Sequence, residues 1–248
     1  VFELIWRDYF RFYALKHGDT IFHSGGPTGQ RVPWNRDARG FEAWKAGRTG
    51  IPLVDANMRE LAATGFMSNR GRQNVASYLA IDLRFDWRLG AAHFEDTLLD
   101  YDVCSNWGNW VSAAGLTGGR VNRFNLIKQS KDYDVNGDYV RHWCPELARV
   151  PAPKVHEPWT LSRDEQERYG VTLGQDYPAQ PLQAKGGYSG GGGGRGGGGG
   201  GGSGGRGGRD FSRTPSQDDV MRRGRGGGGA VRGRSNRRGG GRVQHGAY

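Results

Sequence analysis

The 248-residue sequence predicts an all-α domain followed by a tail that has no core of its own. Three observations support this prediction. Apolar residues recur at helical spacing over most of the first part, and no segment alternates polar and apolar residues with period two. Glycine and proline residues divide this part into pieces of helix length. The composition then changes sharply near Lys185, which separates the helical part from the tail.

Five helices are expected before residue 100. Residues 3–16 carry apolar and aromatic side chains all round, which predicts a helix that is buried on more than one face and ends at Gly18. A glycine- and proline-rich loop follows and presents Trp34. The other four helices are expected at about 37–46, from Pro52 to a stop at Gly65, at about 69–83 and at about 86–99.

Regular structure is sparser after Trp110. Glycines at 115, 118 and 119 predict a loop, and the segment with Phe124 and Ile127 is expected to be irregular. A short helix is expected at 138–143. Ser162 and Glu165 form a capping-box pattern for one last short helix. We therefore expect a helical domain over 1–160, a C-terminal helix and linker over 161–185, and a tail over 186–248.

The tail differs from the domain in both glycine content and charge. It holds 28 of the 45 glycines and twelve arginines against three aspartates, so it carries +9 of the net charge of +10. With few large apolar side chains it cannot offset its chain entropy, and we expect it to be disordered. Two interpretations stay open: a solvated tail without a specific role, or an RNA-contacting one through Arg-Gly-Gly tracts such as 206–208.

Several functional classes are disfavoured. The first 185 residues carry a net charge of only +1, so the folded part has no overall basic character for nucleic-acid binding. Cys104 and Cys144 lack CxxC spacing and no secretory signal precedes them, which favours a reduced intracellular compartment, without choosing among nucleus, cytoplasm and organelle. No apolar run approaches the roughly 20 residues of a membrane span. The six histidines have no metal-ligand spacing.

Residues 132–138 match the first half of a calcium-binding EF-hand loop, including its glycine at the sixth position. The twelfth position is Trp143, where such a loop needs a bidentate glutamate. An ordinary turn built from aspartate, asparagine and glycine is the better interpretation, so no metal is expected.

The stretch from Asp100 to Trp110 combines two carboxylates, two carboxamides and two indoles. Carboxylates and amides are costly to bury unless they are hydrogen-bonded, whereas indoles favour burial, so this mixture predicts a pocket for a flat ring system with polar edges. Asp100 and Asp102 are either a catalytic carboxylate pair or caps for the following helix. Arg70 and Arg72, near a helix N-terminus, oppose the helix dipole, which points to a ligand or an acidic partner.

Five motifs occur in one order: Leu-Ile-Trp-Arg-Asp at 4–8, Gly-Arg-Thr-Gly through Met-Arg-Glu at 47–60, Thr-Gly-Phe-Met-Ser-Asn-Arg-Gly-Arg at 64–72, Asp-Trp-Arg at 86–88, and 100–110. Together they resemble the C-terminal helical, flavin-binding domain of the photolyase/cryptochrome family. Residues 6–8, Asn57 and 131–134 make the chain most similar to the cryptochrome DASH branch. The resemblance runs from residue 1 to about Trp159. Because the chain starts without a methionine or a helix cap, we expect a fragment that lacks the family's N-terminal antenna domain.

The resemblance implies FAD as cofactor and assigns roles to matching residues. FAD would contact Arg7, Asn69, Arg72, Asp100, Asp102 and Asn106. Arg72 would pair with Asp100, and Asn106 would face the flavin N5. Positions that approach a pyrimidine dimer flipped into the pocket are matched by Glu3, Trp6, Asn69 and Arg70. The electron-hopping chain is matched by Trp110, Trp87 and Trp34, which with Asn106 are the expected catalytic residues.

The implied activity is blue-light-driven repair of cyclobutane pyrimidine dimers, with a preference for single-stranded DNA, by electron transfer from excited reduced FAD. The resemblance allows a folate-type antenna, methenyltetrahydrofolate, in the missing N-terminal domain, and it implies a monomer. We expect the fragment alone to be inactive and to bind FAD weakly.

Two departures from the family keep other functions open. Ser112 stands where photolyases place a second aromatic residue that stacks on the lesion, at a loss of roughly 1 to 3 kcal/mol per base. Phe66 stands where many relatives have tryptophan. One alternative is a blue-light photoreceptor that keeps the flavin and the tryptophan chain but repairs nothing. A further alternative is RNA binding through the tail.

Overall fold

The computed structural model describes residues 2–119, 121 and 123–184. The expected disordered tail at 186–248 lies outside the described residues. The described part is helical and contains no β-strand, only two isolated bridges, Asn35 with Phe85 and Leu173 with Tyr177. This confirms the predicted all-α class. None of the helices described is long and apolar enough to cross a membrane.

The helices are α1 (Phe2–His17), α2 (Ala38–Lys45), α3 (Pro52–Thr64), α4 (Asn69–Ser77), α5 (Trp87–Thr97), α6 (Val103–Ala113), α7 (Leu126–Tyr133), α8 (Asp138–Trp143) and α9 (Arg163–Tyr169). Several predicted boundaries are confirmed. Pro52 opens α3, and Gly65 ends it in the left-handed conformation at φ 69°. Ser162 and Glu165 form the predicted capping box of α9.

Two predicted segments differ from the structure. The helix expected over 69–83 ends at Ser77 and continues as a π-helical turn, Tyr78–Asp82. The segment expected to be irregular contains α7, whose first turn is capped by the side chain of Asn125, which accepts from the Lys128 amide. This asparagine is the start signal that the sequence reading missed.

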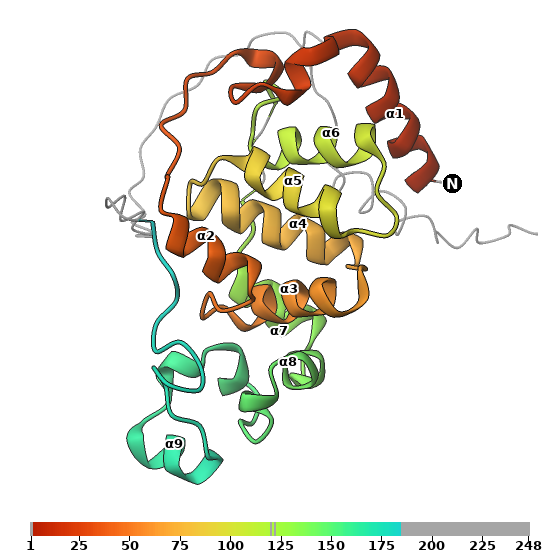
Figure 1. Cartoon of the computed structure of the whole chain (residues 1–248). Helices are drawn as coiled ribbons and strands as arrows, with labels where there is room; N and C mark the ends of the chain where they lie inside the picture. Colours follow the sequence, from red (N-terminus) through yellow and green to blue (C-terminus); the bar gives the residue numbers. More distant parts are fainter. Residues whose placement is uncertain (1, 120, 122, 185–248) are drawn as a thin grey trace, which may run out of the picture. The chain divides into compact units, whose positions relative to one another are not determined.

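The larger of two cores lies between α2, α3, α4, α5 and α6. Figure 1 shows α6, α5, α4 and α3 one above another. Glycines allow two close approaches: a Cβ on Gly90 would lie 2.2 Å from the Trp110 ring, and a Cβ on Gly108 would lie 2.2 Å from the Phe10 ring. Gly90 therefore lets α5 meet α6, and Gly108 lets α1 meet α6.

Helix α1 is not buried on more than one face, so that prediction is wrong for the described chain. Phe10 is buried against α6, but Leu4, Ile5, Phe12 and Leu15 are 57%, 57%, 71% and 80% exposed. The reason is that α6 is the principal helix that α1 packs against among the described residues. Apolar periodicity shows which side chains favour burial but not whether the chain supplies a neighbour to cover them.

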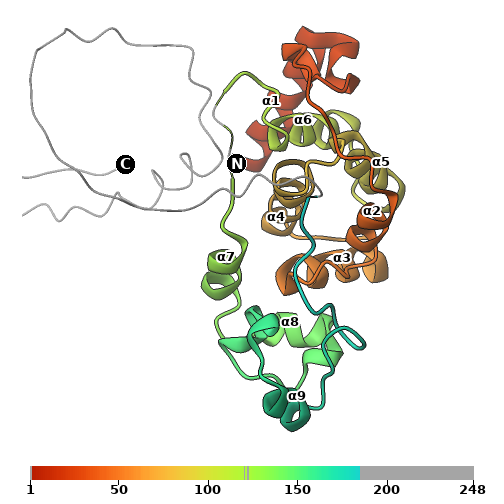
Figure 2. The same ribbon diagram turned by 90° about the vertical axis from the view of Figure 1, so that its left-hand side faces the viewer.

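A second, smaller core joins α8 and the following segments to α3 through Ala56; its buried members include Val140, Cys144, Leu147, Val155 and Tyr177. Figure 2 shows α8 and α9 below α3, away from α6. The chain then returns to the larger core. Tyr177 donates through its hydroxyl to the fully buried Asp55 carboxylate, and the Leu182 amide donates to the Thr49 carbonyl at 2.7 Å.

Candidate functional site

An arginine in the first turn of α4 forms an ion pair with a carboxylate that precedes α6. Arg72 Nη2 lies 2.9 Å from both carboxylate oxygens of Asp100, and Arg72 Nε donates to the Met67 carbonyl at 2.8 Å. The pairing expected for these two residues is therefore present. It also answers why an arginine stands near a helix N-terminus, since the acidic partner comes from the same chain. The ion pair fixes the start of α4 against the connection between α5 and α6.

Asp102 is the N-cap of α6. Its carboxylate accepts from the Ser105 amide at 2.8 Å. This hydrogen bond lowers the pKa of Asp102 below its ordinary value, and the positive charges of Arg11 and Arg7 act in the same direction. A carboxyl group with a lowered pKa is a poor proton donor near neutral pH. Capping is therefore the role that the structure gives Asp102, and the acid–base pair loses support.

Asn106 lies one turn further along α6 and is buried, at 9% exposed. Its amide nitrogen donates to the Ala91 carbonyl of α5 at 2.9 Å. This bond orients the carboxamide, because Nδ2 is committed to the protein and Oδ1 has no protein partner among the described residues. The side chain therefore offers a fixed acceptor at the α6 surface.

Helix α1 brings its first two turns to the same end of α6. Trp6 packs on Tyr9 and Phe10, with ring centroids 5.4 Å and 5.9 Å apart. Arg7 pairs with the neighbouring Asp8 at 2.9 Å and still lies close enough to Asp102 to influence its pKa. Glu3 is exposed one turn earlier.

The start of α4 supplies the remaining predicted residues. Asn69 is exposed, and the guanidinium of Arg70 lies over the Tyr133 ring, 5.4 Å from its centroid. In Figure 1 the first turns of α1, the start of α4 and the connection from α5 to α6 lie on the same side of the helical stack. The structure thus brings the predicted binding residues to one end of the larger core.

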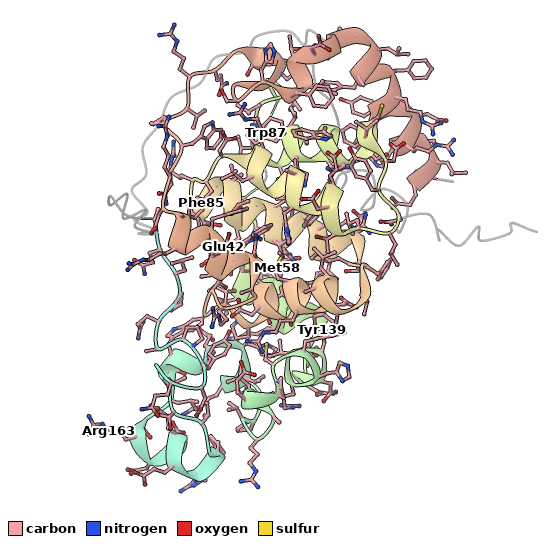
Figure 3. The ribbon with its side chains drawn as sticks, viewed as in Figure 1. Glu42, Met58, Phe85, Trp87, Tyr139 and Arg163 are labelled. Atoms are coloured by element: carbon pink, nitrogen blue, oxygen red, sulfur yellow. The ribbon has the colours of Figure 1, made fainter. Side chains whose placement is uncertain are left out.

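The three predicted electron-transfer tryptophans lie on α6, on α5 and in the loop before α2. Trp110 on α6 is 2% exposed and reaches α5 at Gly90. Trp87 on α5 is fully buried, and Figure 3 labels it near the turn that carries residues 18–30. Trp34 is half-buried in the loop before α2. The indole N–H groups of Trp87 and Trp34 both donate to the Ser24 carbonyl, at 3.2 Å and 3.3 Å. This shared acceptor brings the two indole N–H groups close to each other.

Sequence reasoning missed two neighbours of this chain of rings. Trp44 is fully buried and meets Trp110 edge to face at 6.2 Å; its spacing of three from Phe41 gave only a helix signal. The Ser24 carbonyl belongs to the main chain, so it has no sequence signal at all. Trp107, one of the two indoles in the stretch 100–110, is half-buried: it packs on Trp87 at a centroid distance of 5.7 Å and donates to Glu95 at 3.0 Å.

The half EF-hand pattern is a turn, as interpreted. The Asp134 carboxylate accepts from the amides of Tyr139 and Val140, at 3.0 Å and 2.9 Å, and Asp132 pairs with Lys128. Both carboxylates are thus used by the protein itself. Among the described residues, no group of three histidine, cysteine or acidic side chains is arranged to hold a metal ion.

The all-α fold thus combines a fixed carboxamide acceptor, one ion-paired and one helix-capping carboxylate, and several indoles, a chemistry that suits a flat ring with polar edges. Residues 1–188 match the family described as the FAD binding domain of DNA photolyase, and the chain belongs to the photolyase/cryptochrome family.

Its relatives carry the name Cryptochrome DASH. The one from Ostreococcus tauri is 61% identical over 171 residues, which cover 69% of this chain and 31% of the relative. The one from Danio rerio is 59% identical over 186 residues, with 74% and 36% covered. The chain thus spans about a third of the length of these relatives. The predicted resemblance to cryptochrome DASH is confirmed.

Solved structures agree. The crystal structure of a cryptochrome from Synechocystis is 56% identical, with a TM-score of 0.71 over 73% of this chain and 38% of that one. A class III photolyase from Agrobacterium tumefaciens is 36% identical, with a TM-score of 0.66 and the same shares covered. FAD is the cofactor of the matched domain, so the prediction of FAD is confirmed, whereas the folate-type antenna stays a prediction.

The residues present fit FAD in their chemistry. The isoalloxazine ring offers both N–H donors and carbonyl acceptors at its edge, and this end of α6 offers the acceptor Oδ1 of Asn106 and the guanidinium of Arg72. Because the pKa of Asp102 is lowered, its carboxylate stays negatively charged, and that charge is already hydrogen-bonded within the protein. No buried charge in this set lacks a partner, which is the condition under which a pocket can hold a large ring at low cost.

Proposed function

We propose that the flavin-loaded protein repairs cyclobutane pyrimidine dimers under blue light, with single-stranded DNA as the favoured substrate. The observation that supports this proposal is the convergence of α1, α4 and α6 on one end of the larger core, where the residues predicted to contact FAD and DNA lie (Figure 1). The chain covers about a third of its relatives' length, so the activity belongs to the whole protein.

FAD supplies light absorption and the transfer of one electron to the dimer, whose ring then opens before the electron returns. The chain's own residues would position the cofactor and polarise its surroundings. Arg72, held in place by Asp100, would supply a stationary cation to a bound flavin, which would favour its negatively charged form. Asn106, whose Nδ2 donates to Ala91, would offer Oδ1 as an acceptor for a proton held on the flavin N5.

Trp110, Trp87 and Trp34 give an electron path from the cofactor toward solvent. Trp110 is held between Phe94, at a centroid distance of 5.1 Å, and Trp44. Its burial excludes water from the first step of the path, while the half-buried Trp34 can exchange an electron with a solute. Short steps between adjacent rings are the physical requirement for such transfer.

The DNA-facing residues are Glu3, Trp6, Asn69 and Arg70. Their different chemistry suits a flipped dimer: an indole offers a stacking face, whereas the carboxylate and carboxamide offer acceptors and donors to base edges. Single-stranded substrate is favoured because extrusion of the lesion then breaks no base pairs. Ser112 is exposed and offers no second stacking face, which adds to the advantage of a substrate that is already unpaired.

The test is conversion of a dimer in a single-stranded oligonucleotide by the reduced, flavin-loaded protein, measured by chromatography of the bases after illumination and in the dark. We expect light-dependent repair, and roughly tenfold weaker oligonucleotide binding in Arg70→Ala. Arg163→Ala, which is exposed on α9, is the matched control and should bind like the wild type. Absence of repaired thymines in the light would refute the proposal.

Exposed Ser112 favours a second candidate, a photoreceptor that keeps the flavin and the tryptophan path without repair. In that case Trp110→Phe abolishes flavin photoreduction and the light response, whereas Arg70→Ala leaves both intact. Restoration of an aromatic residue by Ser112→Tyr separates the candidates: it should raise dimer affinity roughly five- to a hundredfold for a repair enzyme and change nothing in a photoreceptor.

A further inference from the structure

Four arginines that pair with no carboxylate among the described residues lie near the half-buried Trp34 in the sequence or across a backbone bridge. Arg31 and Arg36 flank it in the loop before α2, Arg39 lies in the first turn of α2, and Arg84 lies across the bridge between Asn35 and Phe85. All four side chains are exposed. We call these four residues the arginine patch. Figure 3 shows nitrogen-tipped side chains projecting from the segment that leads into α2.

The fold, and not the sequence alone, places Arg84 in the patch. The Asn35 amide donates to the Arg84 carbonyl at 2.6 Å, and the Asn35 side chain donates to the Leu83 carbonyl at 3.3 Å. These bonds tie the Trp34 loop to the segment after the π-helical turn. Arg84 itself has a positive φ of 56°, a conformation that costs a non-glycine residue energy and that this clasp holds in place.

Nearby carboxylates do not neutralise the patch. Asp82 is paired with Arg123 at 2.5 Å, Asp86 with Arg88 at 2.7 Å, and Glu42 with Lys45 at 3.2 Å. Asp37 is the one remaining acidic side chain among these segments, and it caps α2 by accepting from the Arg39 amide. Positive charge therefore dominates around Trp34. Elsewhere in the described chain most arginines and lysines pair with a carboxylate.

The positive charge of the arginine patch lies close enough to the Trp34 indole to act on solutes that approach it. Arg36 follows Trp34 by two residues, so their Cα atoms lie within about 8 Å, which is comparable to the screening length at physiological ionic strength. A cluster of like charges within that range raises the local concentration of oppositely charged solutes.

We propose that the arginine patch recruits small monoanionic one-electron reductants, of the enediolate class, to Trp34. This rests on the electron path proposed above. When Trp34 is oxidised to its radical cation, the reductant monoanion gives it one electron and releases one proton to water. Trp34 returns to its neutral form and the reductant leaves as a radical anion. A small solute is favoured over a nucleic acid strand because the four charges belong to one short loop and to the segment bonded to it at Asn35.

The first test needs no flavin. Quenching of tryptophan fluorescence is compared for iodide, caesium and uncharged acrylamide, and the difference between the wild type and Trp34→Phe isolates Trp34. We expect iodide to quench this component roughly threefold or more better than caesium at low salt, with the preference lost at high salt. The double variant Arg36→Gln with Arg84→Gln should lose the preference and keep acrylamide quenching unchanged. The matched control is Arg163→Gln with Arg168→Gln on α9. Equal quenching by iodide and caesium in the wild type would overturn the proposal.

The second test follows photoreduction of the flavin-loaded protein with ascorbate or with uncharged 2-mercaptoethanol. The patch variant should slow the ascorbate reaction several-fold and leave the thiol reaction unchanged. Normal photoreduction in Trp34→Phe would refute the electron path itself. Equal salt dependence for both reductants, in a protein whose photoreduction does require Trp34, would refute only the role of the patch.

Discussion

Replacement of Gly90 by alanine should test the contact between α5 and the first tryptophan of the electron path. The added Cβ would lie 2.2 Å from Cη2 and 2.6 Å from Cζ3 of Trp110, and 2.7 Å from Cδ2 of Leu79. Carbon atoms pack at about 3.5 Å or more, so the indole has to move by about 1.3 Å. It has little room, because Trp110 is 2% exposed and touches Phe94 and Trp44.

Two effects of opposite sign set the magnitude. Overpacking a well-filled core costs typically 1–3 kcal/mol, whereas alanine in a helix interior is favoured over glycine by about 1 kcal/mol. We expect a net loss of up to about 2 kcal/mol in the free energy of unfolding. Urea denaturation measures it, and a slower flavin photoreduction should accompany it. The control Gly119→Ala meets nothing closer than 3.8 Å and should change stability little. A gain of about 1 kcal/mol for Gly90→Ala would show that propensity acts alone and that Trp110 is not held as described.

Three further changes probe the rest of the domain. Arg72→Lys keeps the charge but loses the hydrogen bonds to both carboxylate oxygens of Asp100, and fluorescence titration should show FAD binding weakened roughly tenfold. An unchanged affinity for FAD would contradict a positioning role for Arg72. Asp134→Ala removes the acceptor of two α8 amides and should cost about 1 kcal/mol in denaturation, whereas Asp132→Ala, exposed beside Lys128, serves as the near-neutral control. Burial lowers the pKa of His156 from 6.5, so the free energy of unfolding should be highest above that pH and should fall at lower pH, where the unfolded chain takes up a proton. Denaturation at several pH values should show a weaker pH dependence for His156→Gln, and an unaltered slope would contradict this role of His156.

The fold class and most helix boundaries could be predicted from the sequence because they depend on local chemistry. Pro52 and Gly65 bound α3 through restricted or permissive φ, and Ser162 caps α9 by a bond within one turn. The errors lie where the surroundings decide. Helix α1 has the apolar pattern of a buried helix, yet Leu15 is 80% exposed because no described element covers it.

The candidate site was predictable in part for the same reason. Asp100 and Arg72 belong to ordered motifs, and their ion pair is present; the flavin and DNA roles of the site residues stay proposals. Trp44 lay outside the predicted path, because no local pattern says that a ring on α2 meets one on α6. Tertiary proximity of this kind depends on helix packing, which periodicity alone does not encode.

The Ser24 carbonyl, which accepts from both Trp34 and Trp87, has a consequence for mutagenesis. A carbonyl oxygen has two lone pairs, so these two indoles use its whole accepting capacity. The serine hydroxyl takes no part, and Ser24→Ala leaves the junction intact. A scan of side-chain substitutions would therefore pass over the carbonyl that joins the last two indoles of the path. Only a backbone ester in place of the peptide after Ser24, which weakens the acceptor without altering any side chain, would reveal it.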